Sequence, residues 1–202
     1  MKLYYAPGAC SLAVHIALRE TGARFDAVAV DLAKHTTAEG ANFYDISPRG
    51  YVPLLQLDDG SRHTEAASLL QYVADLDSQQ RLIGAVGSAR RLAVVEWLTF
   101  VSTELHKTFS PWLWHKETAD STRQAVKDKL ALRFAELDAL LSTQDYLAGD
   151  YSVADAYAFT IVNWANFLAL PLTPYPHLQA YLGRVSQRPH VQAALRAEGL
   201  AK

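Results

Sequence analysis

The first 77 residues combine the two spacings of apolar positions that are typical of strands and helices. Residues 3–5 are apolar and predict a strand over 2–5, and the alternation over 25–30 predicts a second strand. Between them, over 11–21, apolar residues recur at the spacing of a helix that ends near a glycine. This stretch therefore predicts a strand, a helix and a second strand.

The strand pattern returns farther along the chain. Residues 52–57 are an apolar run, and the Asp-Asp-Gly-Ser sequence at 58–61 is a strong hairpin turn that leads to a short strand near 62–64. From Glu65 onward, apolar residues at helical spacing predict a second helix. The order is βαβ, an irregular segment, then ββα, which is typical of a small α/β domain with a mixed sheet.

The remaining chain predicts helices only. Residues 78–87 are rich in polar residues and glycine, which is the composition of a linker. The candidate helices are 88–109, 121–142, 152–168, 176–187 and 190–198. Ser152 and Asp155 have the spacing of a capping box, with Asp in the place of the usual Glu. We therefore expect an α/β domain over 1–77, a linker over 78–87 and an all-helical domain over 88–202.

Composition narrows the class of protein. Half of the 202 residues are apolar, so the chain has enough material for a core. Its 19 basic and 21 acidic residues give a net charge of −2, and without a basic tract the charge gives no support for nucleic-acid binding. The chain has a single cysteine, which excludes an intrachain disulfide and fits a reducing compartment.

The apolar segments do not predict a membrane protein. The run after Lys2 is too short for a signal peptide. The long uncharged stretch at 156–172 is slightly short for a membrane span and contains polar residues, so we interpret it as a buried core helix. We expect a cytoplasmic protein that does not bind membranes.

The single cysteine, Cys10, lies where the first strand turns into the first helix. Pro7 and Gly8 mark that turn, and the helix follows directly. A thiol at a helix N-terminus lies near unpaired backbone N–H groups, where a thiolate forms more easily than in a free cysteine. The position indicates a reactive thiol. The alternative is a small buried apolar side chain, the ordinary role of a lone cysteine.

Two further candidates lie in the α/β domain. Pro53, in the sequence Tyr51-Val52-Pro53, starts a strand, where a cis bond would expose the backbone of Val52 to an extended ligand; an ordinary strand-initiating proline is the alternative. Glu65 starts a helix, where it can accept from a ligand ammonium while the free N–H groups receive a carboxylate. Alternatively, Glu65 only complements the helix dipole.

The first helix of the C-terminal domain carries a polar face. Thr99, Thr103 and His106 lie at i, i+4 and i+7, which places them on one side of an α-helix. Such a face is usually only solvated, but His106 can donate a hydrogen bond to a sulfur or a carboxylate. Metal binding is not predicted, because no His or Cys pair has ligand spacing.

Five motifs together resemble the cytosolic glutathione transferases, and specifically the bacterial beta class. The motifs are Tyr5-x-Pro7-Gly8-Ala9-Cys10-Ser11-Leu12, Ser47-Pro48-x-Gly50-x-Val52-Pro53, Thr64-Glu65, Thr103-Glu104-Leu105-His106-Lys107 and Ser152-Val153-Ala154-Asp155-Ala156-Tyr157. The resemblance implies a thioredoxin-like N-terminal domain that binds glutathione, an all-α C-terminal domain that completes the second-substrate pocket, and a homodimer. Glutathione is then a co-substrate, and no other cofactor is implied.

The resemblance also implies residue roles. Cys10 contacts the glutathione sulfur and can form a mixed disulfide with it, and His106 lies near that sulfur. Val52, before a cis Pro53, pairs with the cysteinyl backbone, and Glu65 with the backbone N–H of Ala66 holds the γ-glutamyl end. Either Lys34 or His35 approaches the glycyl carboxylate. The implied glutathione-binding set also includes Tyr5, Tyr51, Thr99, Thr103, Glu104 and Lys107.

Three functions follow from these features. The preferred hypothesis is conjugation of the glutathione thiol to a small hydrophobic electrophile in detoxification, with Phe109, Trp112, Trp114 and Trp164 lining the second pocket; the alternative for these aromatic residues is the core. A second hypothesis is glutathione-dependent disulfide reduction or reductive dehalogenation with Cys10 as nucleophile. A third is a non-catalytic ligand carrier or interaction module. The identity of the electrophile stays open.

Overall fold

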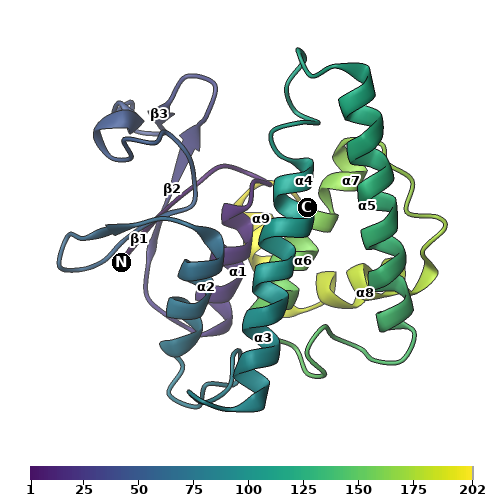
Figure 1. The fold of residues 1–202 in the computed structure, drawn as a ribbon. Coiled ribbons are helices and arrows are strands. Elements are labelled where there is room, and N and C mark those ends of the chain that lie inside the picture. Colours follow the sequence, from purple (N-terminus) through teal and green to yellow (C-terminus); the bar gives the residue numbers. More distant parts are fainter. Residues whose placement is uncertain (202) are drawn as a thin grey trace. The chain divides into compact units, whose positions relative to one another are not determined.

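The computed structural model describes residues 1–201 and divides the chain into two compact units (Figure 1). The first unit consists of Met1–Arg81 together with the chain from Arg188 onward, and the second consists of Leu82–Gln187. The observed boundary therefore falls inside the predicted linker at 78–87.

The first unit contains a five-stranded mixed sheet. Its strands are β1 (Lys2–Tyr5), β2 (Asp26–Asp31), β3 (Thr36–Thr37), β4 (Leu54–Gln56) and β5 (Arg62–His63), in the order β3-β2-β1-β4-β5. β1 runs parallel to β2, and the other neighbours are antiparallel. Leu3 of β1 pairs with Ala27 on one side and with Leu55 on the other, and its side chain is fully buried. The predicted mixed sheet is confirmed.

Helices complete the core of this unit. α1 (Ser11–Glu20) packs against α2 (Ala66–Asp75) and α9 (Pro189–Ala197), and eight of its residues are buried. The segment that the sequence left irregular contains β3 and the 3₁₀ turn η1 (Phe43–Asp45). Phe43 of this turn is fully buried in a small cluster with Tyr4 and Leu54.

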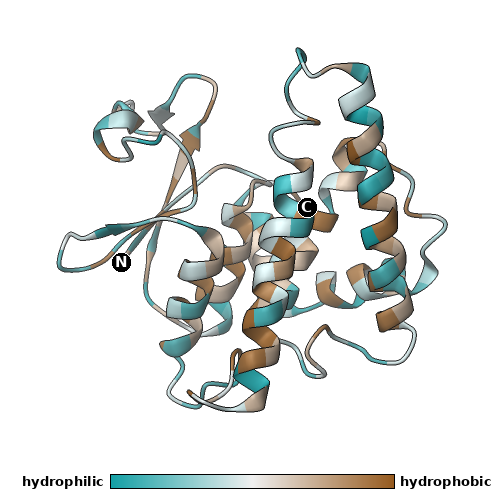
Figure 2. Cartoon of the chain, viewed as in Figure 1, coloured by the Kyte–Doolittle hydropathy of each residue, from teal (hydrophilic) through white to brown (hydrophobic). Residues whose placement is uncertain are grey.

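The second unit is helical. Its elements are α3 (Ala89–Phe100), the π-helical turn η2 (Val101–His106), α4 (Lys107–Phe109), α5 (Asp120–Leu141), α6 (Val153–Val162), α7 (Trp164–Phe167) and α8 (Pro176–Ser186). Figure 2 shows hydrophobic and hydrophilic residues alternating along α3 and α5, as expected for helices with one face in a core. All ten residues of α6 are buried, so α6 is the centre of this unit.

A capping box starts α6, as the sequence predicts. The hydroxyl of Ser152 accepts from the backbone N–H of Ala154, and the carboxylate of Asp155 accepts from Ser152 N at 2.8 Å. Asp155 also accepts from Leu147 N at 2.9 Å and from the hydroxyl of Tyr181 at 3.0 Å. This buried carboxylate therefore ties the start of α6 to the preceding loop and to α8.

The structure differs from the predicted domains at the C-terminal end. The sequence places residues 88–202 in one helical domain, whereas the chain from Arg188 onward belongs to the first unit. The reason is that α9 packs on α1, and Arg188 forms a two-bond ion pair with Glu20 at 2.8 and 3.0 Å. The predicted helix over 152–168 also divides, at Asn163, into α6 and α7.

No helix within residues 1–201 is long and apolar enough to cross a membrane.

Candidate active site

Cys10 lies at the N-terminal boundary of α1, as predicted. It is the N-cap residue of the helix, and Gly8 before it has a φ of +72°, a conformation that favours glycine. The Cys10 side chain is only 8% exposed, and its Sγ donates to the carbonyl oxygen of Val52 at 3.4 Å. The thiol is more deeply buried than the sequence suggests, because the Val52 segment lies against it.

The segment next to Cys10 has the backbone conformation that the resemblance implies. The peptide bond between Val52 and Pro53 is cis, and β4 begins directly after it, at Leu54. The sulfur atom and the backbone of Val52 thus meet at one place in the first unit. A potential nucleophile, the sulfur of Cys10, therefore lies next to the backbone that leads into β4.

Glu65 starts α2 and forms a polar cluster with two residues of the loop before β4. It is the N-cap residue of α2, with a φ of +69°. Its carboxylate accepts from the hydroxyl of Tyr51 at 2.7 Å and from Nη1 of Arg49 at 3.3 Å. Ala66, the first residue of α2, is buried and has no side-chain donor, so only its backbone can serve a ligand. Sequence reasoning found Tyr51 and Glu65 but missed Arg49.

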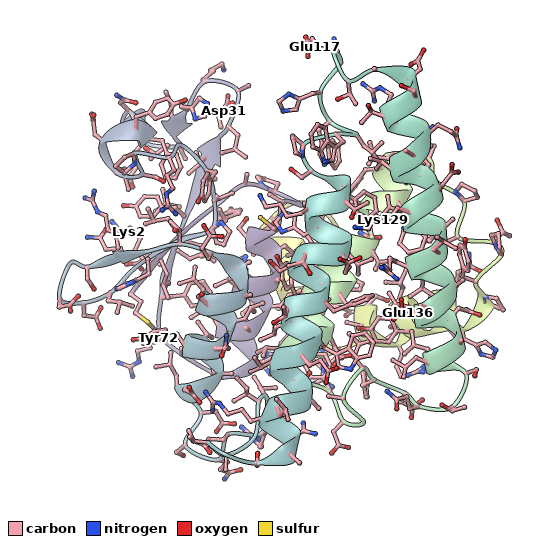
Figure 3. The ribbon with its side chains drawn as sticks, viewed as in Figure 1. Lys2, Asp31, Tyr72, Glu117, Lys129 and Glu136 are labelled. Atoms are coloured by element: carbon pink, nitrogen blue, oxygen red, sulfur yellow. The ribbon has the colours of Figure 1, made fainter. Side chains whose placement is uncertain are left out.

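His35 and Lys34 lie in the same unit but face different partners. The His35 ring stacks on Tyr44 with centroids 4.4 Å apart, and its Nδ1 is buried without a hydrogen-bond partner in the described part of the chain. The ammonium of Lys34 pairs with Asp31 at 3.3 Å; Figure 3 labels Asp31 beside β3.

Tyr44, the ring partner of His35, also explains the glycine at position 50. A Cβ atom at Gly50 would lie 2.6 Å from the ring of Tyr44, which is too close for any other residue.

A buried polar chain connects the C-terminal segment to the loop before Cys10. Glu198 accepts from the backbone N–H of Gly8 at 3.0 Å and lies 2.8 Å from Nδ1 of His15, with both side chains fully buried. Arg19 donates to Nε2 of His15 at 3.0 Å, so the ring proton of His15 sits on Nδ1 and is donated to Glu198.

The hydrogen-bonded series of Gly8, Glu198, His15 and Arg19 also affects Tyr5. The sequence analysis did not predict this series. Burial raises the pKa of the Tyr5 hydroxyl, and the charge of Glu198 raises it further. His15 was the available signal, because it is a polar residue among apolar neighbours in the first helix.

His106 belongs to the second unit, where its ring is hydrogen-bonded to Tyr157. Its Nδ1 lies 2.7 Å from the hydroxyl of Tyr157, a buried residue of α6, and its ring meets Trp164 edge-on at 5.1 Å. The predicted common face with Thr99 and Thr103 differs from this arrangement. Both threonines are exposed and donate to carbonyls of their own helix, at Val95 and Thr99.

The physical reason is the helix type. Residues Val101–His106 form a π-helix, which has more residues per turn than an α-helix. The i, i+4, i+7 rule therefore fails between Thr99 and His106. π-helical turns are frequent at functional sites, which is consistent with the functional role that the sequence predicts for His106.

Glu104 and Lys107, next to His106, have different surroundings. Nη2 of Arg133 lies 2.8 Å from the Glu104 carboxylate and the Lys129 ammonium lies 3.3 Å from it; Figure 3 labels Lys129 on α5. The hydrogen bonds from Arg133, and then from Lys129, lower the pKa of Glu104. Lys107 is exposed. Glu104 thus links η2 to α5.

The four aromatic residues predicted to line a pocket fall into two groups. Trp112 and Trp114 are 45% and 44% exposed, so they offer apolar surface to a ligand. Trp164 is 5% exposed and meets Trp114 edge-on at 5.6 Å. Phe109 is fully buried between Phe134 and Trp164, so its assignment as a pocket-lining residue is wrong for this structure: it supports the ring of Trp164 from the core.

Residues 1–201 contain no group of three or more His, Cys, Asp or Glu that could hold a metal ion.

Comparisons with known proteins agree with this geometry. The family "Glutathione S-transferase, N-terminal domain" matches residues 8–76, and "Glutathione S-transferase, C-terminal domain" matches 100–189. Glutathione S-transferase GstA of Escherichia coli O157:H7 is 41% identical over 201 residues, which cover 99% of this chain and 100% of that protein.

Two solved structures are similar over their full length. A sphingomonad glutathione S-transferase complexed with glutathione is 44% identical, with a TM-score of 0.94, and 100% of both chains is covered. The bacterial beta-class glutathione S-transferase of Sphingomonas chungbukensis is 42% identical, also with a TM-score of 0.94 and full coverage of both chains.

The chain therefore belongs to the glutathione S-transferase family. Its fold is the thioredoxin-like α/β unit followed by the helical unit of that family, and within the family it is an enzyme of the bacterial beta class.

Proposed function

We propose that the first unit binds glutathione across Cys10 and Val52, and that the enzyme conjugates the glutathione thiol to small hydrophobic electrophiles in detoxification. The observation that carries this proposal is the 3.4 Å hydrogen bond from Sγ of Cys10 to the carbonyl of Val52. It brings the thiol to a backbone edge with which an extended peptide can pair, so a bound cysteinyl residue would present its own sulfur beside Cys10.

The remaining contacts divide by the ends of the tripeptide. In this proposal, Val52 pairs with the cysteinyl backbone, and Glu65 with the N–H of Ala66 holds the γ-glutamyl end. His35 or Lys34 takes the glycyl carboxylate. The other proposed glutathione-binding residues are Tyr5, Tyr51, Pro53, Thr99, Thr103, Glu104 and Lys107.

In the reaction, the glutathione thiol loses its proton to solvent and its sulfur attacks the electrophilic carbon. A carbon–sulfur bond forms, and the leaving group departs with its electron pair. Cys10 and His106 provide the polar environment that holds the sulfur as a thiolate, and His106 serves as a hydrogen-bond donor. Binding both reactants together supplies part of the rate.

The electrophile is apolar in this proposal because exposed aromatic surface is available to it. Trp112 and Trp114 present that surface, and Trp164 lies behind Trp114. We further propose that the enzyme is a cytoplasmic homodimer that needs no cofactor besides glutathione as co-substrate.

A second candidate function uses Cys10 itself as the nucleophile in disulfide reduction, deglutathionylation or reductive dehalogenation. In disulfide reduction, the thiolate of Cys10 attacks a disulfide, forms a mixed disulfide and releases one thiolate. Cys10 is the only cysteine, and Ala13 stands where a dithiol motif has its second cysteine. A second glutathione thiolate must therefore resolve the mixed disulfide.

Replacing Cys10 separates these two functions. We expect the Cys10→Ala variant to keep a measurable part of the conjugation activity and to form no mixed disulfide with oxidised glutathione, as detected by intact-protein mass spectrometry. Cys10→Ser should behave in the same way in both assays. A folded Cys10→Ala variant without any conjugation activity would contradict the proposal and favour the second function.

A further inference from the structure

Arg49 lies in the loop before β4, and one nitrogen of its guanidinium makes its contacts. Nη1 donates to the hydroxyl of Tyr51 at 3.0 Å, to the hydroxyl of Thr64 at 3.4 Å and to the carboxylate of Glu65 at 3.3 Å. The hydrogen bond to Tyr51 is the main cause that raises the pKa of Arg49. The guanidinium is thus held in a defined place while its side chain stays 64% exposed.

The opposite edge of this guanidinium is open. Within residues 1–201, no acceptor takes the N–H bonds of Nε and Nη2 of Arg49. Nε and Nη2 form the side-on edge of a guanidinium, which binds a carboxylate through two parallel hydrogen bonds. Arg49 therefore presents a ready carboxylate-binding edge to solvent.

Glu65 presents the complementary group beside it. Its Oε1 accepts from Tyr51 and Arg49, whereas the other carboxylate oxygen, Oε2, has no hydrogen-bond donor in the part of the chain that the structure describes. The Glu65 side chain is 61% exposed. Nη1 of Arg49 lies 3.3 Å from Oε1 of Glu65, so a guanidinium with an open edge and a carboxylate with an open oxygen belong to one cluster. This pair complements an α-amino acid group, which carries an ammonium and a carboxylate on one carbon.

We propose that Arg49 binds the α-carboxylate of the γ-glutamyl residue of glutathione while Oε2 of Glu65 accepts from its ammonium. This inference rests on the proposed function, and it adds a binding residue and a basis for specificity. Only the γ-glutamyl end of glutathione carries both charges on one carbon, since the glycyl end has a carboxylate alone. Because Ala66 has no side-chain donor, Arg49 supplies a side-chain contact to this carboxylate.

The rival explanation is that Arg49 only positions Glu65. Both explanations predict weaker binding of glutathione when Arg49 is replaced. They differ for a ligand without the α-carboxylate, because such a ligand has nothing to gain from a direct contact with Arg49. A comparison of two ligands on the same variants therefore separates the two roles.

The test is isothermal titration of the full-length protein with glutathione and with 4-aminobutanoyl-Cys-Gly, which lacks only the α-carboxylate. The variants are Arg49→Met, which removes the charge, and Arg49→Lys, which keeps the charge without the two-nitrogen edge. Arg24→Met is the control, because Arg24 is an exposed residue of the same unit and its loss changes the net charge equally. Thermal unfolding verifies that each variant is folded.

We expect Arg49→Met to raise the Kd for glutathione about tenfold, as for the loss of an exposed two-bond charged contact. The Kd of the shortened ligand should change less than about twofold, which is within the effect of a surface ion pair. Arg49→Lys should fall between wild type and Arg49→Met for glutathione, and Arg24→Met should match wild type.

An equal loss for both ligands would overturn the inference, since it would show that Arg49 acts only through Glu65. Unchanged binding of glutathione by Arg49→Met would overturn it as well. If the wild-type protein bound no glutathione, the proposed function would fail together with it, and this outcome is distinct from the other two.

Discussion

The contact between His106 and Tyr157 shows how a single buried hydroxyl can hold a side chain that we propose to be catalytic. The tyrosine lies on α6, is 1% exposed and holds Nδ1 of His106 at 2.7 Å. When the hydroxyl donates to Nδ1, the ring proton is on Nε2, so the opposite side of the imidazole is a donor. Tyr157 is therefore a positioning residue for His106.

Replacement of Tyr157 by Phe tests this role at the scale of one atom. We expect kcat for conjugation to fall about tenfold, which corresponds to the loss of one hydrogen bond of about 1.4 kcal/mol. The KM for glutathione should change little, and the pH profile of kcat should shift, because the tautomer of His106 is no longer fixed. Steady-state kinetics over pH 5.5–9 measure both parameters.

Tyr175→Phe is the matched control for that variant. Its hydroxyl donates to the carbonyl of Ala131 at 3.1 Å, in the same unit but at an exposed site. An equal loss of kcat in both variants, or an unshifted pH profile in Tyr157→Phe, would show that Tyr157 has only a structural role.

At the scale of elements, Glu104 connects the π-helical turn η2 to α5. Arg133 and Lys129, both on α5, lower the pKa of its carboxyl from the ordinary value of 4.5. A lowered pKa in the folded state means that the charged form contributes stability above about pH 4.5. That contribution disappears as the pH falls through the lower pKa of the folded state.

The Glu104→Gln variant should therefore be less stable than wild type at pH 7. The difference between the two proteins should shrink as the pH falls from 4.5 toward 3. Urea unfolding over this pH range measures it, with Glu117→Gln as an exposed control, which Figure 3 labels near the loop before α5. A difference that stays constant with pH would contradict the charge-based account.

Sequence periodicity predicted most elements because most of them bury one regular face. Val94, Leu98, Val101 and Leu105, which recur at helical spacing, form a stripe that is buried in the structure. The π-helical turn could not be predicted from this stripe, because the spacing of the stripe also fits an uninterrupted α-helix. The turn contains no proline or glycine that would mark it. The threonine–histidine face was therefore predicted with the wrong geometry.

The candidate site was predicted where local sequence determines it. Cys10 and Glu65 are helix-starting residues, a position that turn signals and apolar spacing reveal. Arg49 and Glu198 were missed because their partners are distant in the chain: Arg49 contacts Glu65, 16 residues away, and Glu198 contacts Gly8, 190 residues away. No pattern of neighbouring residues encodes such contacts.

At the scale of the whole molecule, the C-terminal segment from Arg188 onward belongs to the same unit as the N-terminal 81 residues. The periodicity of α9 predicts a helix but not the partner of its apolar face, so the sequence alone assigned it to the helical domain. In the structure, α9 covers α1, and Glu198 just after it holds the loop that precedes Cys10. The C-terminal segment thus supports the unit that we propose to bind glutathione.

Glu198→Ala tests this support. The change removes the charged acceptor for Gly8 N–H and for the ring N–H of His15 and leaves both donors unpaired, so the free energy of unfolding should fall by about 3 kcal/mol. The KM for glutathione should rise, because the loop before Cys10 loses its anchor. Urea unfolding and steady-state kinetics measure the two effects. Glu39→Ala, an exposed site in the same unit, is the control; if both variants behaved alike, the C-terminal segment would not support the site.

The central claim is that glutathione binds across Cys10 and Val52, and a crystal structure of the enzyme with glutathione tests it most directly. We expect the cysteinyl backbone of the tripeptide to pair with Val52, its sulfur to lie beside Sγ of Cys10, and its γ-glutamyl end to reach Glu65. Glutathione bound elsewhere, with the Cys10 thiol still closed off by the Val52 segment, would contradict the account.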